Sequence, residues 1–94
     1  MTISTKAQKE LSLSWEWYED RQQGLGDRFA ATIMQQLEVI AANPETYSIK
    51  RKPFREAKAS VFPFVIVYKI HARRKLIEVI SIFHTFRNPS KKYK

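Results

Sequence analysis

The spacing of the apolar residues changes near the middle of the chain, and this change constrains the fold more than any other feature. From Ala7 to Ile40 the apolar residues recur every three or four positions, as on one face of a helix. From Phe64 to Phe83 the chain is instead rich in β-branched and aromatic residues, which is typical of strands. The order of helices before strands predicts an α+β fold in which the helices cover a sheet.

The first helix is expected from about Lys6 to Gln22. Thr5 and Gln8 have the spacing of a capping box at its start. Leu13 and Trp17 lie off the main apolar face, which indicates a second apolar contact, such as one with a partner chain. The main face is expected to hold Ala7, Leu11, Trp15 and Tyr18.

A second helix follows after a short link. Gly24 and Gly26 are the only glycines of the chain and stand on either side of Leu25, so they are expected to end the first helix and release the second. Asn43 and Pro44 are expected to close the second helix. The short link predicts an antiparallel helical hairpin. The buried face of the second helix is expected to hold Leu25, Phe29, Ile33, Leu37 and Ile40.

The second half of the chain predicts strands. A short segment from Phe54 to Ser60 precedes a central strand from Phe64 to Ile70, and the charged turn HARRK leads into a strand from Leu76 to Phe83. A short edge strand within Met1–Ser4 is a further expectation. The basic tail, His84–Lys94, is expected on the surface.

The length and composition limit the class of protein. A chain of 94 residues with 44% hydrophobic residues supports one modest core, so we expect a single domain over residues 1–94. The chain has no cysteine, and therefore no disulfide and no cysteine nucleophile. Its longest apolar stretch, near Phe62–Tyr68, is far below the roughly 18 residues of a membrane span. We expect a cytoplasmic protein with no membrane contact, no cofactor and no metal.

Positive charge is concentrated in the second half of the chain. Residues 1–49 contain four Lys and Arg against seven Asp and Glu, a net charge of −3, whereas residues 50–94 contain thirteen against two, a net charge of +11. This asymmetry favours a polyanionic partner, either nucleic acid or an acidic protein segment. The alternative is that lysines at strand edges and turns serve solubility.

Four sequence segments resemble the ParE/RelE toxin superfamily, and most closely its ParE-like plasmid stabilisation toxins. They are WEWYEDRQQGLGDRF, AANPETY, FREAKASVFPFVIVYKI and IEVISIFHTFRNP, and together they cover nearly the whole chain. The resemblance implies an N-terminal antiparallel helical hairpin packed on a small antiparallel β-sheet. Members of the superfamily usually open with a longer first strand than Thr2–Ser4 provides.

The resemblance also implies a function. Such proteins are toxins of type II toxin–antitoxin systems, usually encoded beside an antitoxin whose C-terminal segment wraps the toxin. ParE-like members act on DNA gyrase, whereas RelE-like members cut messenger RNA on the ribosome. Our preferred interpretation is a growth inhibitor that binds gyrase. The alternatives are a ribosome-dependent, metal-independent endoribonuclease and a non-toxic basic binding module of the same fold.

Endoribonuclease chemistry of the RelE type needs groups that move protons and groups that stabilise the charge of the phosphorane. Arg87 and Tyr93 have the Arg-then-Tyr spacing that resembles the C-terminal end of RelE-like nucleases. Under this interpretation alone, the candidate catalytic residues are Arg55, His84, Arg87 and Tyr93.

Three of these candidates also have structural interpretations. His84 is in phase with Ile80 and Ile82, which predicts a half-buried ring that hydrogen-bonds to the backbone at the strand end. Tyr93 could pack on the rim of the sheet. Arg55 shares a strand face with Ala57, where it could meet phosphate or an antitoxin carboxylate, or it could pair with Glu56 or Glu78 across strands.

Two binding surfaces are expected. Leu13 and Trp17 are expected to contact an acidic, amphipathic antitoxin segment that covers apolar surface and neutralises charge. Contacts to the target or to nucleic acid are expected from Arg55, Lys58, Arg73, Arg74, Arg87, Lys91 and Lys92.

His71, in the hairpin turn, is expected to be solvated, and the two histidines give no metal-ligand pattern.

Overall fold

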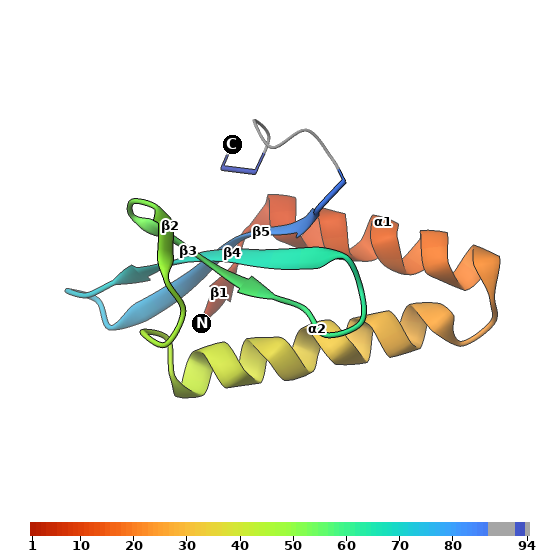
Figure 1. Ribbon diagram of the computed structural model, residues 1–94, viewed down its shortest axis with the longest axis horizontal. Coiled ribbons are helices and arrows are strands. Elements are labelled where there is room, and N and C mark those ends of the chain that lie inside the picture. Colours follow the sequence, from red (N-terminus) through yellow and green to blue (C-terminus); the bar gives the residue numbers. More distant parts are fainter. Residues whose placement is uncertain (87–91, 94) are drawn as a thin grey trace.

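The computed structural model of the protein describes residues 1–86 and 92–93. Two helices, α1 (Thr5–Arg21) and α2 (Leu25–Ala42), form a hairpin beside one five-stranded sheet (Figure 1). Across the sheet the strands lie in the order β1 (Thr2–Ile3), β5 (Leu76–His84), β4 (Phe64–His71), β3 (Phe54–Lys58) and β2 (Ile49–Arg51).

The predicted α+β class is confirmed, but the sheet is mixed rather than purely antiparallel. β1 runs parallel to β5, whereas all other neighbours are antiparallel. The expected edge strand at the N-terminus therefore exists, as a parallel one. The edge strand β2 was not expected, because its residues, Ile49, Lys50 and Arg51, are all exposed and show no alternation of apolar and polar side chains.

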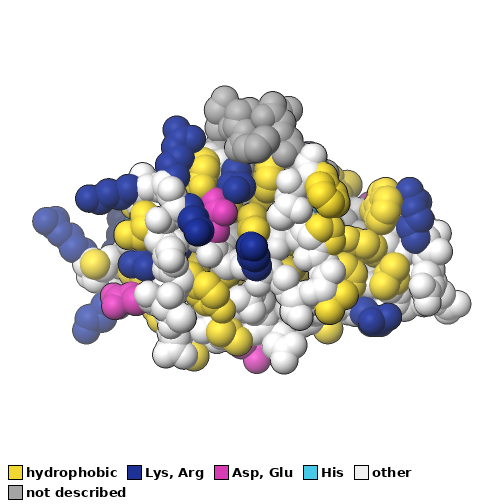
Figure 2. Space-filling view, viewed as in Figure 1, with side chains coloured by type: hydrophobic (Ala, Val, Ile, Leu, Met, Phe, Trp, Pro, Cys, Tyr) yellow, Lys and Arg dark blue, Asp and Glu magenta, His cyan; other side chains and the backbone are white. Residues whose placement is uncertain are grey.

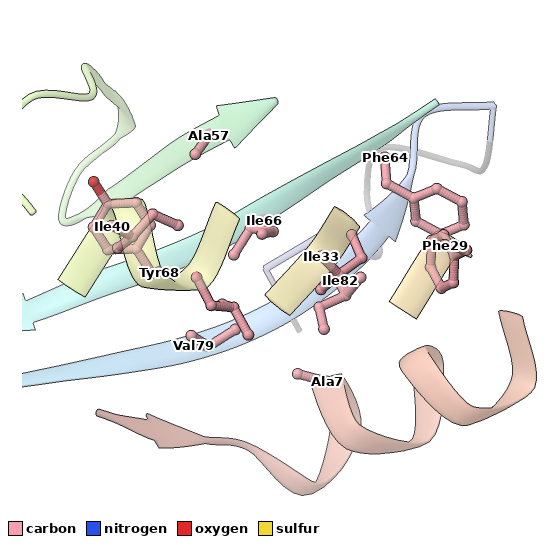
Figure 3. Packing of buried hydrophobic residues seen from close by; sticks show 11 residues of the cluster. Ala7, Phe29, Ile33, Ile40, Ala57, Phe64, Ile66, Tyr68, Val79 and Ile82 are labelled. Carbon is pink, nitrogen blue, oxygen red and sulfur yellow. The ribbon is translucent and has the colours of Figure 1, made fainter. Parts of the chain in front are cut away.

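The main core lies between the helices and one face of the sheet. Figure 3 shows Phe29, Ile33 and Ile40 of α2 packed against side chains of β4 and β5. Four of the five residues expected on the buried face of α2 are buried, and Leu25 is half-buried. The sheet contributes Ala57, Phe64, Ile66, Tyr68, Val79 and Ile82.

The glycines of the helical link have separate roles. Gly24 has a φ of 87°, a conformation that favours glycine. Gly26 packs so tightly against α1 that a Cβ atom would lie 2.6 Å from the Trp15 carbonyl oxygen. The Glu19 carboxylate accepts hydrogen bonds from the backbone N–H of Gly24 at 2.8 Å and of Gly26 at 2.9 Å. Glu19 therefore satisfies donors at the start of α2.

The start of α1 differs from the prediction by one residue. The capping side chain is Ser4, not Thr5, and its Oγ accepts from the Ala7 N–H at 3.0 Å. The same hydroxyl donates to the Ile80 carbonyl oxygen at 2.8 Å. The cap thus joins α1 to the edge of β5, which places the helix beside the sheet.

A bulge in β5 changes which side chains face the helices. Val67 pairs with Ser81 and Tyr68 pairs with Val79, so Ile80 is an extra residue. Val79 packs in the main core, while Ile80 packs in a smaller cluster on the opposite face. That cluster is built on Val65, Val67 and Phe83.

Candidate functional site

An apolar groove of about 560 Å³ lies between α1 and the adjoining ends of β4 and β5. Leu13 and Trp17 line it from α1 and are 49% and 53% exposed, which confirms that they lie off the buried face of the helix. Phe86, just after β5, is 83% exposed. The groove is lined by Leu13, Ser14, Trp17, Tyr18, Phe64, His84 and Phe86.

Aromatic packing fixes the α1 side of the groove. The Tyr18 ring lies 5.1 Å from Phe29 and 5.1 Å from Phe62, measured between ring centroids, and burial raises the pKa of its hydroxyl. Trp17 packs edge-on against Tyr18 at 5.1 Å. The Arg21 guanidinium lies 4.0 Å from the Trp17 ring centroid. The groove thus offers an apolar surface with the Arg21 cation beside it.

His84 closes the groove at the end of β5. Its ring lies 5.0 Å from Phe64 and 5.2 Å from Phe86. The His84 Nδ1 accepts the backbone N–H of Phe86 at 3.1 Å. The expected half-buried ring and backbone bond are both present, but Ile80 lies on the other face of the sheet because of the bulge.

Arg55 binds the backbone of the loop that follows α2. Its Nη1 donates to the Tyr47 carbonyl oxygen at 2.6 Å and to the Glu45 carbonyl oxygen at 3.4 Å. It does not form the anticipated pair with Glu56 or Glu78, since those carboxylates contact other side chains. The guanidinium therefore supplies backbone acceptors of an irregular segment with donors.

Tyr93 and Lys92 pack on the face of the sheet that is opposite to the helices. The Tyr93 hydroxyl donates to the Glu56 carboxylate, and Lys92 Nζ lies 3.1 Å from the same carboxylate. The Tyr93 ring lies 5.0 Å from the Phe54 ring and 5.2 Å from the Arg51 guanidinium carbon. Tyr93 therefore packs on the sheet, but half-buried on its face rather than exposed at its rim.

The surroundings of Tyr93 keep its hydroxyl protonated. Burial, together with the hydrogen bond and negative charge of Glu56, raises the pKa of Tyr93 to about 12, against a smaller lowering by Arg51. A phenol with this pKa is a poor base near neutral pH. This position therefore favours a packing role over proton transfer.

The three described candidates for nuclease chemistry do not converge. Arg55 pairs with Tyr68 and His84 pairs with Phe64, so they lie four β4 residues apart, roughly 13 Å along the strand. Tyr93 lies on the other face of the sheet. Arg87 lies outside the described residues.

The remaining predicted contacts differ in exposure. Lys58, Arg73 and Arg74 are exposed, whereas Lys92 is paired with Glu56. Lys91 lies outside the described residues. His71 is not a solvated turn residue, because it ends β4 and its Nε2 lies 2.8 Å from the Glu78 carboxylate.

Two acidic residues have roles that the sequence analysis did not assign. Glu56 binds the side chains of Lys92 and Tyr93, and the signal available was that it is one of two acids in the second half of the chain. Glu10 reaches the edge of β5, where its carboxylate accepts from Ser81 Oγ at 2.8 Å and from the Ile82 N–H at 3.1 Å. Nothing local in the sequence indicates this second contact.

The chain is similar to a protein family in sequence and to a solved structure in fold. The family described as "ParE toxin of type II toxin-antitoxin system, parDE" matches residues 1–89. A solved structure described as "Chromosomal ParDE TA system from P. aeruginosa" is 17% identical, covers 89% of this chain and 95% of its own, and superposes with a TM-score of 0.75. No curated protein sequence matches the chain. Within residues 1–86 and 92–93, no helix is long and apolar enough to cross a membrane.

Proposed function

Because this chain belongs to the ParE toxin family of type II toxin–antitoxin systems, we propose that it inhibits growth by binding DNA gyrase. The observation that carries this proposal is the separation of the three described nuclease candidates, Arg55, His84 and Tyr93. Arg55 is bonded to backbone carbonyls, His84 lies beside the apolar groove, and Tyr93 is bonded to Glu56 on the other face. Cleavage of RNA requires acid, base and charge stabilisation around a single phosphate. This arrangement favours binding over catalysis.

Purified components test the target. Gyrase is incubated with relaxed plasmid DNA, ATP and increasing amounts of the protein, and supercoiling and DNA breaks are followed. We expect loss of supercoiling or trapped breaks. As a matched test in cells, induction is expected to raise DNA-damage signalling while messenger RNA remains intact. Ribosome-dependent cuts at codon positions, with normal gyrase activity, would contradict the proposal.

We further propose that the apolar groove receives an apolar segment of the cognate antitoxin. Membership of the family implies such a partner. Leu13 and Trp17 expose apolar surface from an ordered helix, and Arg21 adds a cation that suits an acidic, amphipathic segment. Burial of these side chains in a complex would remove apolar area from water without reorganising the toxin core.

Replacement of the groove side chains tests the antitoxin contact. Leu13→Ser with Trp17→Ser is expected to weaken antitoxin binding by at least tenfold, since each large apolar side chain contributes about 1.5–3 kcal/mol when buried. The matched control is Met34→Ser with Val39→Ser, which removes two exposed apolar side chains of α2 that do not line the groove. Equal effects of the two variants would argue against the groove as the docking site.

A further inference from the structure

Two triplets of cations that are far apart in the sequence lie at the same end of the sheet. The first triplet is Lys50 and Arg51 at the end of β2 with Lys52 in the turn to β3. The second triplet is Arg73, Arg74 and Lys75 at the tip of the β4–β5 hairpin. All six residues are exposed. Figure 2 shows several Lys and Arg side chains projecting at this end of the molecule.

Strand register brings the triplets together. Arg51 pairs with Phe54, Arg55 pairs with Tyr68, and His71 pairs with Leu76. The β2–β3 turn therefore lies two strands to the side of the hairpin tip and a few residues short of it. With strands about 4.8 Å apart and about 3.3 Å per residue, the triplets are separated by roughly 15 Å. A single small anion cannot reach both, whereas a polyanion can.

Neither triplet forms an ion pair with an acid within the described part of the chain, where Glu56 pairs with Lys92 and Glu78 contacts His71. Glu78, the acid of β5, is thus already engaged by His71 at 2.8 Å. Arg51 lies against the Tyr93 ring, a contact that leaves its positive charge intact. Exposed, uncompensated cations are the groups that neutralise phosphates and release counterions.

The surroundings favour nucleic acid over an acidic protein. Protein interfaces depend on large apolar or aromatic anchors, whereas most protein–DNA hydrogen bonds go to the phosphate backbone. Ile49 is exposed beside the first triplet and Met1 is exposed beside the start of β5, but neither is aromatic, while Leu13, Trp17 and Phe86 belong to the groove. The apolar end thus suits a protein partner, and the basic end suits phosphates.

We infer that the basic end formed by the two triplets binds the phosphate backbone of duplex DNA, without reading sequence. Contact with DNA held by gyrase rests on the proposed function, whereas direct DNA binding does not. Binding by six exposed cations is electrostatic, so its strength falls steeply with salt. The toxin would then contribute its own DNA contact beside any protein contact with its target.

Binding of the full chain to a short labelled DNA duplex of arbitrary sequence tests this inference in the absence of gyrase. From roughly 50 to 200 mM salt, the logarithm of the binding constant is expected to fall linearly with the logarithm of salt concentration. Arg73→Gln with Arg74→Gln, and separately Lys50→Gln with Lys52→Gln, should each reduce the slope by about 2 and weaken binding about tenfold or more at low salt.

The matched control removes the same charge elsewhere. Lys9→Gln with Arg28→Gln neutralises two exposed cations of the helices and is expected to change binding much less. An equal loss in this control, or no binding of the unaltered protein at low salt, would overturn the inference. Preference for polyglutamate over DNA at equal charge concentration would also overturn it. Normal gyrase inhibition with no DNA binding would leave the proposed function intact and remove this inference alone.

Discussion

The Tyr93 hydroxyl donates a hydrogen bond to the Glu56 carboxylate, which joins the tail to the middle of β3. Lys92 approaches the same carboxylate, and the Tyr93 ring packs on Phe54. Tyr93 therefore covers part of the smaller hydrophobic cluster on the face that the helices leave open. A tyrosine that resembles a nuclease residue in sequence has a packing role in this chain.

Replacement of this tyrosine should affect stability more than toxicity. Tyr93→Phe keeps the ring but removes a hydrogen bond to a charged acceptor, so we expect a loss of about 1–2 kcal/mol in the free energy of unfolding. Urea unfolding measures this loss, and growth inhibition should persist. A folded Tyr93→Phe protein without toxicity would instead assign the hydroxyl to function.

Alkaline pH should release the tail. The pKa of Tyr93 is raised to about 12 from its ordinary value of 10, so the folded state favours the protonated phenol. Its contribution to stability is complete below pH 10 and is lost as the pH rises toward 12. The difference in stability between the unaltered protein and Tyr93→Phe should therefore shrink across this range. A constant difference would contradict the assigned pKa.

Substitution of Gly26 should be more damaging than its helical position suggests. A Cβ atom would lie 2.6 Å from the Trp15 carbonyl oxygen, so Gly26→Ala should separate α1 from α2 and cost about 1–3 kcal/mol. Gly24 is the matched control, because a Cβ there has open space but the φ is 87°. Gly24→Asn should cost less than about 1 kcal/mol, since asparagine tolerates this conformation. Thermal unfolding of both variants tests this order.

Arg55 should be a stabilising residue. Arg55→Met removes the donor that satisfies the Tyr47 and Glu45 carbonyl oxygens, and we expect a loss of about 1–3 kcal/mol. Any reduction in toxicity should follow the folded fraction and recover at lower temperature. Complete loss of toxicity in a variant with unchanged unfolding would show that Arg55 contacts the target.

The helices were predictable because their signals are local. Gly24 marks the end of the hairpin link, and the periodic residues of α2 identify its buried face. The strand edges were less predictable. The Ser4 cap depends on the Ile80 carbonyl, which is 76 residues away in sequence, and β2 has no apolar alternation that could identify it.

The part of the candidate site that lies on α1 was also predictable, because helical periodicity is a local signal. The exposure of Leu13 and Trp17 follows from their position on the helix, so their place in a groove could be anticipated. The partners of Arg55 and Tyr93 could not, because a backbone carbonyl in a loop and a carboxylate on a distant strand leave no periodic signal. Residue types alone thus suggested a nuclease site, but the structure places Arg55 and Tyr93 on opposite faces of the sheet.

The bulge at Ile80 also has a consequence for comparison among relatives. Regular alternation through β5 would turn Ile82 and His84 toward the Tyr93 face, whereas the extra residue keeps both on the side of the helices. A relative with one residue fewer in this strand can preserve the same two surfaces without a bulge. Differences in length among homologues should therefore be tolerated at position 80, and an alignment gap placed elsewhere in the strand would exchange the residues that face the groove with those that face Tyr93.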